Sequence, residues 1–270
     1  NEGKGPAPER LPNNYRVYTL DQVNELRRLV AAMKPNEASR YLPHRRPHEP
    51  VQIIGVVNFK GGSGKTTTSA HLCHYLALQG YRVLAIDLDP QASLTVMFGV
   101  QPETDVGPNQ TMMGAVRYDA QRCAMRDVVR KTYFPGIDLV PGNIELQEYE
   151  SETPYAMMKG RDKQGLFFER LRMAIQEVED DYDIIILDTA PTLGFMTLSA
   201  VYAVTGLVVS LHPAMLDVLS MSQFLQMLND LIGTIRDDAG AELEARLFQY
   251  LITRHDPNDQ AQAQVHPRVS

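Results

Sequence analysis

The chain has 270 residues, of which 44% are hydrophobic and 22% charged, a composition typical of folded globular proteins that excludes global disorder. Its net charge of −7 gives no overall basic footprint for nucleic acid, so any contact with DNA must come from a local patch. The two cysteines, Cys73 and Cys123, exclude a disulfide framework and a four-thiolate metal site within one chain.

Charge and hydrophobicity vary along the chain. Residues 1–50 hold nine Lys and Arg against six Asp and Glu, whereas the remaining 220 residues hold 17 against 27. No stretch approaches the roughly 18 apolar residues that a membrane-spanning helix requires, and the N-terminus has no signal-peptide pattern. We therefore expect a cytoplasmic protein that makes no membrane contact.

The first 50 residues are expected to form an N-terminal extension. Residues 1–14 are rich in Pro, Gly and Asn, which predicts a flexible lead. Thr19 and Gln22 form a capping box and apolar residues follow at helical spacing, which predicts a short amphipathic helix over 20–33. The prolines of segment 43–50 indicate a linker, so we place a domain boundary near residue 50.

From residue 51 onward, apolar runs alternate with amphipathic segments. The predicted helices cover 65–79, 164–179, 193–204 and 215–237, and the predicted strands cover 51–58, 82–87, 137–140, 183–188, 206–211 and 247–252. Most of these strands are nearly continuous apolar runs, as in strands that are buried on both faces of a parallel sheet. The alternation predicts an α/β domain over 51–270 with a doubly wound, mainly parallel sheet and right-handed crossovers.

A glycine-rich segment joins the first of these strands to the first helix. It reads N-F-K-G-G-S-G-K-T-T-T over residues 58–68. Its glycines let backbone N–H groups converge on phosphate oxygens, and the positive end of the following helix points at the same anion. Lys65 would bridge the β- and γ-phosphates of ATP, and the Thr66 hydroxyl would be a ligand of Mg²⁺. The spacing and context disfavour the alternative, a glycine loop that merely joins two elements.

This segment departs from the plain Walker pattern. Phe59 stands where that pattern has glycine, and a second lysine, Lys60, precedes the glycines. With this deviant Walker motif and the segment LAIDLDPQASLT over 84–95, the chain resembles the ParA/MinD branch of P-loop ATPases. The runs YRVYTLDQVNELRRL and PHRRP ahead of the motif make it most similar to the RepA partition proteins of repABC-type plasmids, over about residues 15–265.

The resemblance implies that Lys60 is a signature lysine, which reaches across a dimer to the partner's ATP phosphates. A sandwiched ATP buries several negative oxygens, and extra cations would offset their repulsion and desolvation. A solvated lysine beside the loop is the alternative. The residues of the loop that are implied to bind nucleotide are Lys60, Gly61, Gly62, Ser63, Gly64, Lys65, Thr66 and Thr67.

Three aspartates are implied to complete this site. Asp87 would lie near the Mg²⁺ shell, Asp89 would position the attacking water, and Asp188 would hold the magnesium through water. Taken alone, an aspartate at the end of a strand could also be a turn former or a helix cap. The implied catalytic residues are Lys60, Lys65 and Asp89, and the implied metal site comprises Thr66, Asp87 and Asp188.

Four residues after the later strands are implied to lie at the edge of the site. Pro213 and Asp217 follow the fifth strand, where this family commonly contacts the facing monomer's nucleotide, although both could simply be a turn and a helix cap. Thr253 and Arg254 follow the last strand, where the adenine base is usually held.

The implied function is an ATP-dependent dimerisation switch in plasmid or chromosome partition. ATP and Mg²⁺ would close a homodimer that binds DNA without sequence preference. A centromere-binding protein of the ParB/RepB type would then speed slow hydrolysis and reopen the dimer. Such an ATPase would be associated with the nucleoid.

Other functions remain open from the sequence. A MinD-like ATPase on the membrane would need a basic amphipathic C-terminal helix, and 255–270 show none. A P-loop metabolic ligase or kinase would show substantial turnover with a specific co-substrate. An iron–sulfur reductase needs two cysteines at a cluster-facing edge, whereas Cys73 lies on the P-loop helix, and Asp89 argues against a non-catalytic DNA-binding regulator.

The two ends of the chain carry separate expectations. In RepA-like proteins a helix-turn-helix-type module precedes the ATPase and binds operator DNA for autorepression, and residues 15–46 resemble its final portion; a solvated linker is the alternative. The arginines that could contact phosphates are Arg27, Arg28, Arg40, Arg45 and Arg46. ParA-type chains normally continue beyond the last predicted strand with further elements, so we expect the ATPase domain to be C-terminally incomplete.

Overall fold

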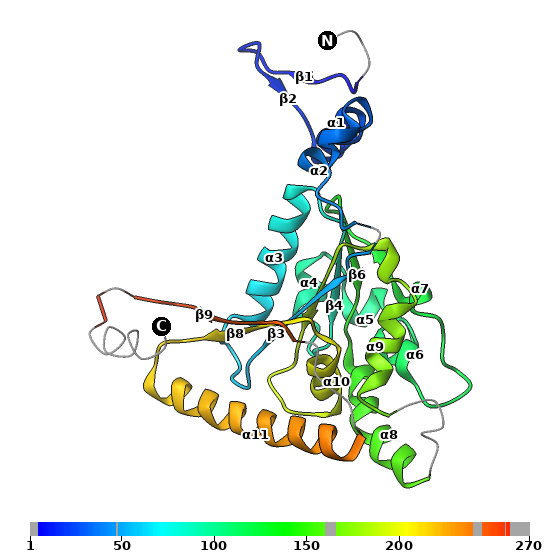
Figure 1. The fold of residues 1–270 in the computed structure, drawn as a ribbon, viewed down its shortest axis with the longest axis vertical. Coiled ribbons are helices and arrows are strands. Elements are labelled where there is room, and N and C mark those ends of the chain that lie inside the picture. The colour runs from blue at the N-terminus through cyan, green and yellow to red at the C-terminus, as the bar shows by residue number, and fades with distance from the viewer. Residues whose placement is uncertain (1–4, 47, 160–165, 240–244, 257, 260–270) are drawn as a thin grey trace.

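A seven-stranded sheet forms the centre of the computed structural model (Figure 1). The residues that the structure describes are 5–46, 48–159, 166–239, 245–256 and 258–259. In spatial order the strands are β5 (Arg130–Lys131), β6 (Ile137–Val140), β4 (Val83–Asp87), β7 (Ile184–Asp188), β3 (Gln52–Val57), β8 (Gly206–Leu211) and β9 (Leu247–Ile252). All neighbouring strands are parallel except β5 and β6, so the predicted doubly wound, mainly parallel sheet is confirmed.

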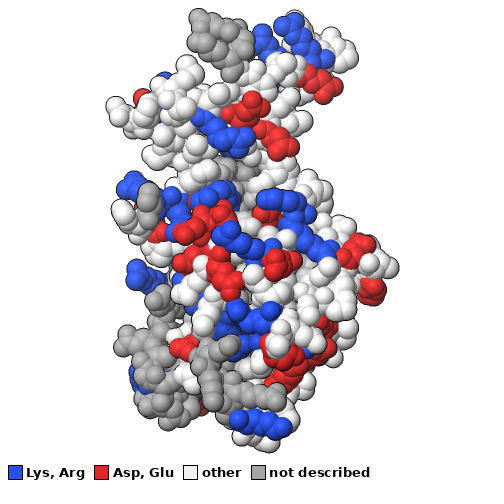
Figure 2. Space-filling view, turned by 90° about the vertical axis from the view of Figure 1, so that its right-hand side faces the viewer, with Lys and Arg blue, Asp and Glu red and all other residues white. Residues whose placement is uncertain are grey.

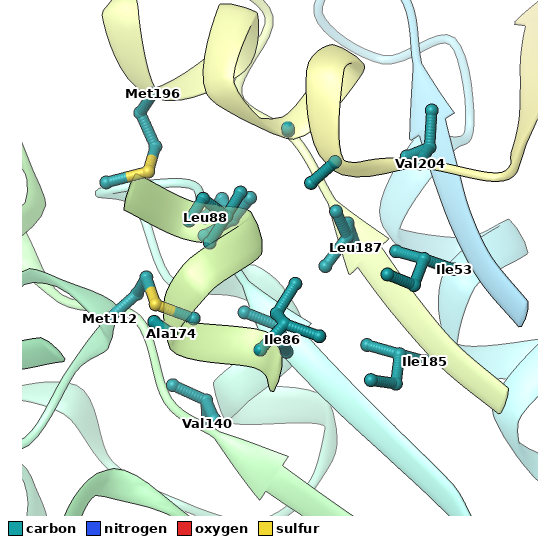
Figure 3. Packing of buried hydrophobic residues seen from close by; sticks show 14 of the residues in the cluster. Ile53, Ile86, Leu88, Met112, Val140, Ala174, Ile185, Leu187, Met196 and Val204 are labelled. Carbon is teal, nitrogen blue, oxygen red and sulfur yellow. The ribbon is translucent and has the colours of Figure 1, made fainter. Parts of the chain in front are cut away.

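The strands are apolar throughout because helices cover both faces of the sheet. In β4, Leu84 and Ile86 enter one hydrophobic cluster, whereas Val83 and Ala85 enter the other. This alternation follows from the two-residue period of a strand, and it explains why the sequence shows an unbroken apolar run. Figure 3 shows the larger cluster, in which Ile86 and Leu187 of the sheet lie close to helix residues such as Met196.

The helices divide between the two faces. On one face lie α3 (Lys65–Gln79) and α4 (Ser93–Met97), which bury residues in the smaller cluster. The larger cluster takes residues from α6 (Met112–Val116), α7 (Met125–Val128), α9 (Glu169–Gln176), α10 (Phe195–Ala203) and α11 (Met215–Ala239). The remaining helices are α5 (Pro102–Asp105), α8 (Gln147–Met158) and the short turns η2 (Ile144–Leu146) and η3 (Glu179–Asp181).

The predicted elements agree with the structure where their apolar patterns are long. The helices over 20–33 and 65–79 and the strands over 137–140, 206–211 and 247–252 have the predicted bounds. The helix predicted over 164–179 is wrong at both ends, because α9 covers only Glu169–Gln176; residues 164 and 165 lie outside the described residues. Short helices α4 to α8 and strand β5 had no prediction, since elements of two to five residues carry little periodicity.

The N-terminal extension projects beyond the sheet, past the end of α3 (Figure 1). It contains α1 (Leu20–Met33), η1 (Pro35–Glu37) and α2 (Ala38–Tyr41), preceded by a hairpin of β1 (Glu9–Arg10) and β2 (Arg16–Val17). The prediction of a flexible lead over 1–14 is therefore wrong for β1; residues 1–4 lie outside the described part of the chain. The turn between the strands is closed by two backbone hydrogen bonds between Leu11 and its neighbours, which the composition of this segment did not reveal.

Two arginines of the extension attach it to the rest of the protein. Arg27 of α1 donates to the carbonyl of Leu78 at 2.7 Å and so satisfies the C-terminal end of α3. The Arg45 guanidinium donates to the carbonyls of Tyr182, Glu49 and Glu179, and its side chain is only 16% exposed. Neither arginine is free to contact a nucleic acid phosphate in this arrangement.

The surface carries mixed charge on the face shown in Figure 2, where blue and red side chains alternate over most of the body. Among the described residues, no helix is both long enough and apolar enough to cross a membrane.

Candidate functional site

The carboxyl ends of β3, β7 and β4 bring the predicted site residues together. The glycine-rich loop follows β3, and Asp188 and Asp87 end the neighbouring strands β7 and β4. The two aspartates are direct partners in the parallel register. Ligands of doubly wound sheets bind at this edge, which agrees with the prediction of a site here.

The glycine-rich loop needs glycine at two of its positions. Gly62 and Gly64 have φ of 74° and 86°, in the left-handed region that side chains with a Cβ rarely adopt. Gly64 directly precedes α3, so the loop turns sharply and delivers the first N–H groups of a 15-residue helix to the same place. Unpaired N–H groups at the positive end of a helix form an anion site.

Neighbouring strands hold the loop from behind. Asn58 accepts a hydrogen bond from the backbone N–H of Lys60 at 2.9 Å and donates one to the carbonyl of Ser210 on β8. Ser63 shares a 3.0 Å hydrogen bond with the Ser210 hydroxyl, and Thr253 donates to the Ser63 carbonyl at 2.8 Å. The sequence gave no indication of Ser210, because a lone serine in an apolar strand has no distinguishing pattern.

Lys65 lies at the start of α3 with only 6% of its surface exposed. Its ammonium group donates to the Lys60 carbonyl at 3.2 Å. Burial lowers the pKa of Lys65, and the nearby charges of Asp188 and Asp89 oppose that shift. A cation that is buried beside two carboxylates at the mouth of an anion site fits the predicted phosphate-binding role.

Lys60 points toward α11 of its own chain. Its ammonium group pairs with Asp217 in the first turn of that helix, while half of the Lys60 side chain stays exposed. On the other side, Nδ1 of His212 lies 3.7 Å from the second carboxylate oxygen of Asp217. The sequence analysis expected Lys60 and Asp217 at a dimer interface and did not expect them to pair with each other.

Asp188 is fully buried and has one unsatisfied oxygen. Its Oδ1 accepts a hydrogen bond from Ser69 at 2.8 Å, and its Oδ2 has no partner among the described residues. Burial raises the pKa of Asp188 to about 6, while hydrogen bonds from Ser69 and Thr66 and the charge of Lys65 oppose the shift. An ionised buried carboxylate with a free oxygen needs a cation.

Asp87 is also fully buried, but its oxygens are engaged. They accept hydrogen bonds from the backbone N–H of Thr95 at 2.9 Å, the Thr95 hydroxyl at 2.7 Å and the N–H of Asp89 at 3.1 Å. Burial and, next, the charge of Asp188 raise the pKa of Asp87 to about 7. A Cβ on Gly142 would lie 3.0 Å from the Asp87 carboxyl carbon, so a larger residue there would press on the site. Neither Thr95 nor Gly142 had been singled out from the sequence.

The residues around Asp188 fit a hard divalent cation such as Mg²⁺. The predicted set of Thr66, Asp87 and Asp188 supplies oxygen atoms alone, which Mg²⁺ prefers. Because Asp87 is saturated by hydrogen bonds, it fits contact through water better than direct ligation. No group of three or more His, Cys, Asp or Glu side chains in the described part of the chain could hold a metal ion by itself. This agrees with a Mg²⁺ ion that shares its ligands with water and phosphate.

Asp89 lies in a loop beside a cavity. Its carboxylate accepts the N–H of Gln91 at 2.9 Å, and the loop faces a second loop over residues 190–192, which follows β7. A cavity of about 470 Å³ lies between the two loops. The cavity is also lined by Glu150 of α8, which accepts N–H groups of Phe195 and Met196 at the start of α10.

A second cavity, of about 480 Å³, opens beside the start of α3. Gly64, Thr67, Thr253 and Arg254 line it together, so the structure brings the residues expected at the adenine base next to the phosphate-binding loop. The Arg254 guanidinium would lie 3.8 Å from a Cβ on Gly62. Pro213 is buried in the loop before α11, outside the lining of this cavity.

Comparison with known proteins agrees with this geometry. Residues 51–240 match a protein family described as an AAA domain. A putative replication protein A of Rhizobium rhizogenes is 50% identical over 254 residues, which are 94% of this chain and 62% of that protein. The chain thus spans less than two thirds of the length of this curated relative.

Two solved structures show the same fold. One is titled a partition protein; it is 25% identical, has a TM-score of 0.73, and the match covers 99% of this chain and 74% of the other. The second is cobyrinic acid a,c-diamide synthase from Mycobacterium smegmatis, solved with bound ADP and magnesium. It is 28% identical with a TM-score of 0.66, and the match covers 81% of each chain.

Proposed function

The chain belongs to the AAA domain family, in its ParA-like branch of P-loop proteins, and on that premise we propose that it is a Mg·ATP-dependent dimerisation switch in plasmid or chromosome partition. The observation that carries the proposal is the buried Asp188, whose unsatisfied oxygen lies near the buried Lys65 at the mouth of a phosphate-binding loop. Such an arrangement is costly in a protein that binds neither an anion nor a divalent cation.

The phosphates of ATP would be held by the loop over 61–64 and by the first turn of α3. The backbone N–H groups there supply hydrogen bonds and the Lys65 ammonium supplies charge, in a place where Gly62 and Gly64 keep side chains away. Bound Mg²⁺ would neutralise phosphate charge and orient the γ-phosphate for attack. Thr66 and Asp188 would face it, with Asp87 behind a water molecule.

The nucleoside would occupy the cavity beside α3. Thr67 lies one turn from the phosphates, and Thr253 and Arg254 border the same space, so one continuous surface leads from the phosphates to the base. The structure of the related diamide synthase with ADP and magnesium supports this choice of ligand.

Hydrolysis would depend on Asp89. Its carboxylate lies in a loop at the edge of the site, next to a cavity that can admit water, and it is held there through the N–H of Gln91. A positioned carboxylate orients the attacking water and contributes modestly to the rate. We expect slow hydrolysis for this reason, with acceleration by a partner that reshapes the loop.

Dimerisation would use Lys60 and the loop before α11. The half-exposed Lys60 side chain would leave its own chain and complete the site of the second copy, near Pro213. A ParB/RepB-type protein and nonspecific DNA would act on the closed homodimer, which would place the protein at the nucleoid. In the N-terminal extension Arg28, Arg40 and Arg46 remain exposed for DNA phosphates.

An ATPase assay with and without nonspecific duplex DNA, over a series of salt concentrations, tests this function. We expect slow turnover that DNA stimulates and that loses its response as salt rises, because phosphate contacts release counterions. Lys60→Ala should abolish the stimulation, and Lys34→Ala, which alters an exposed lysine in a surface ion pair, should not. Rapid turnover that does not depend on DNA would instead favour a metabolic ligase or kinase.

A further inference from the structure

Lys60, His212 and Asp217 form a cluster of two nitrogen bases around one buried carboxylate. Lys60 pairs with Oδ1 of Asp217, and His212 faces Oδ2 at 3.7 Å. The Asp217 side chain is only 5% exposed, against 50% for Lys60 and 28% for His212. The three residues come from the phosphate-binding loop, the end of β8 and the start of α11, so the cluster joins three parts of the site.

The histidine is the unusual member. Its Nδ1 is buried and has no hydrogen-bond partner among the described residues. A buried polar atom without a partner is unfavourable and calls for an explanation. The carboxylate that could accept its proton is close, but 3.7 Å exceeds hydrogen-bonding distance while Lys60 holds Asp217.

The charges decide what happens when Lys60 leaves. A buried carboxylate that loses its cation is strongly destabilised. Among the charged groups that face His212, Lys60 belongs to the loop and Asp217 to α11. The end of β9 adds Arg254, whose guanidinium lies against Gly62. A protonated imidazole is therefore the replacement cation that lies nearest to Asp217 once Lys60 has gone.

We propose that Asp217 and His212 are positioning residues for Lys60: Asp217 holds the lysine within its own chain, and a proton on His212 takes Asp217 over and releases the lysine. The consequence for dimerisation rests on the proposed function, whereas the exchange of cations on Asp217 does not. Because release is coupled to proton uptake, it becomes more favourable as pH falls through the range in which histidine titrates, near 6.5. A difference of about one pH unit between the midpoints of the two states would change the release equilibrium about tenfold.

The exchange can be tested without nucleotide, by following the histidine ring protons in NMR spectra over a pH titration. The signal of His212 is identified by its loss in His212→Gln. We expect its titration midpoint to rise by about one pH unit in Lys60→Ala and to fall in Asp217→Asn, while His44 in the distant linker titrates equally in all three proteins. An unchanged midpoint of His212 in Lys60→Ala overturns the proposal.

The consequence for dimerisation is tested by sedimentation velocity with Mg²⁺ and a non-hydrolysable ATP analogue. Wild type should need about tenfold less analogue for half-maximal association at pH 6 than at pH 8. His212→Gln should need equal amounts at both pH values, and His44→Gln should behave as wild type. Equal pH dependence in wild type and His212→Gln would contradict the proposal. If no variant associates at either pH, the proposed function fails, and the NMR titration still decides the role of His212.

Discussion

Replacing Asp188 by asparagine should stabilise the protein at pH 8 when divalent cations are chelated. The pKa of Asp188 is about 6 in the folded protein and 3.8 in a model peptide, chiefly because the carboxyl is buried. A folded pKa above the unfolded value means that the stabilising, protonated form is present below about pH 4 and is lost as pH rises through 6. Above pH 7 the ionised group costs about 3 kcal/mol of folding free energy by this linkage.

Asparagine keeps the local geometry. Its amide oxygen can still accept the hydrogen bond from Ser69, and its nitrogen replaces Oδ2, which has no partner in the described structure. Loss of the charge also relieves Asp87, whose pKa the charge of Asp188 helps to raise. We therefore expect a gain on the order of 3 kcal/mol at pH 8 and roughly half of it at pH 5.

The assay is denaturant unfolding in EDTA at pH 8 and at pH 5, and Asp183 offers a matched control at the other end of the same strand. Burial alone would raise the pKa of Asp183, but hydrogen bonds from Arg82 and from the Arg45 backbone outweigh burial and hold its pKa below the ordinary value. Asp183→Asn should therefore destabilise the protein, by roughly 2 kcal/mol. The reasoning is refuted if Asp188→Asn is less stable than wild type at pH 8, or if its gain is equal at both pH values.

Two further pairs of substitutions test the packing around the site. Gly194→Ala should lower stability by roughly 2 kcal/mol in thermal unfolding, because a Cβ there would lie 2.4 Å from Oε1 of Glu150; Gly233→Ala in α11, with nothing within 4 Å of the added Cβ, should instead raise stability by up to about 1 kcal/mol. Equal shifts in both variants would contradict the assignment. Arg45→Ala should expose the linker to proteolysis at an unchanged rate of ATP hydrolysis, because Arg45 donates to three carbonyls and a carboxylate, whereas Arg46→Ala, at a side chain that is 78% exposed, should resist proteolysis as wild type does.

The sequence predicted the parts of the site that lie close together in the chain. The loop over 58–68 needs its glycines and Lys65 in fixed order, because one turn of backbone must present both N–H groups and an ammonium to one anion. The strands and α3 were equally accessible, since burial on both faces of a sheet leaves an unbroken apolar run. Comparison with relatives confirms the family that these motifs indicated.

The chain order alone could not reveal which groups support the site from a distance. Thr95 holds Asp87, Ser69 holds Asp188, and Ser210 braces the loop, yet each is an ordinary residue in its own segment. The partners of the arginines in the extension were equally hidden: Arg45 looked like a phosphate ligand and instead contacts carbonyls more than 130 residues away. Short helices in 93–158 escaped prediction because tertiary packing, more than local periodicity, stabilises them.

The sequence by itself determined that a triphosphate-binding loop follows the first buried strand, because the chemistry of that loop resides in consecutive residues. Only the tertiary structure decided that Asp188 keeps a buried oxygen without a partner and that Asp217 holds Lys60 beside His212. Both depend on which strands become neighbours and on how α11 leaves the sheet. Burial and charge act through space, and so a pattern along the chain cannot contain them.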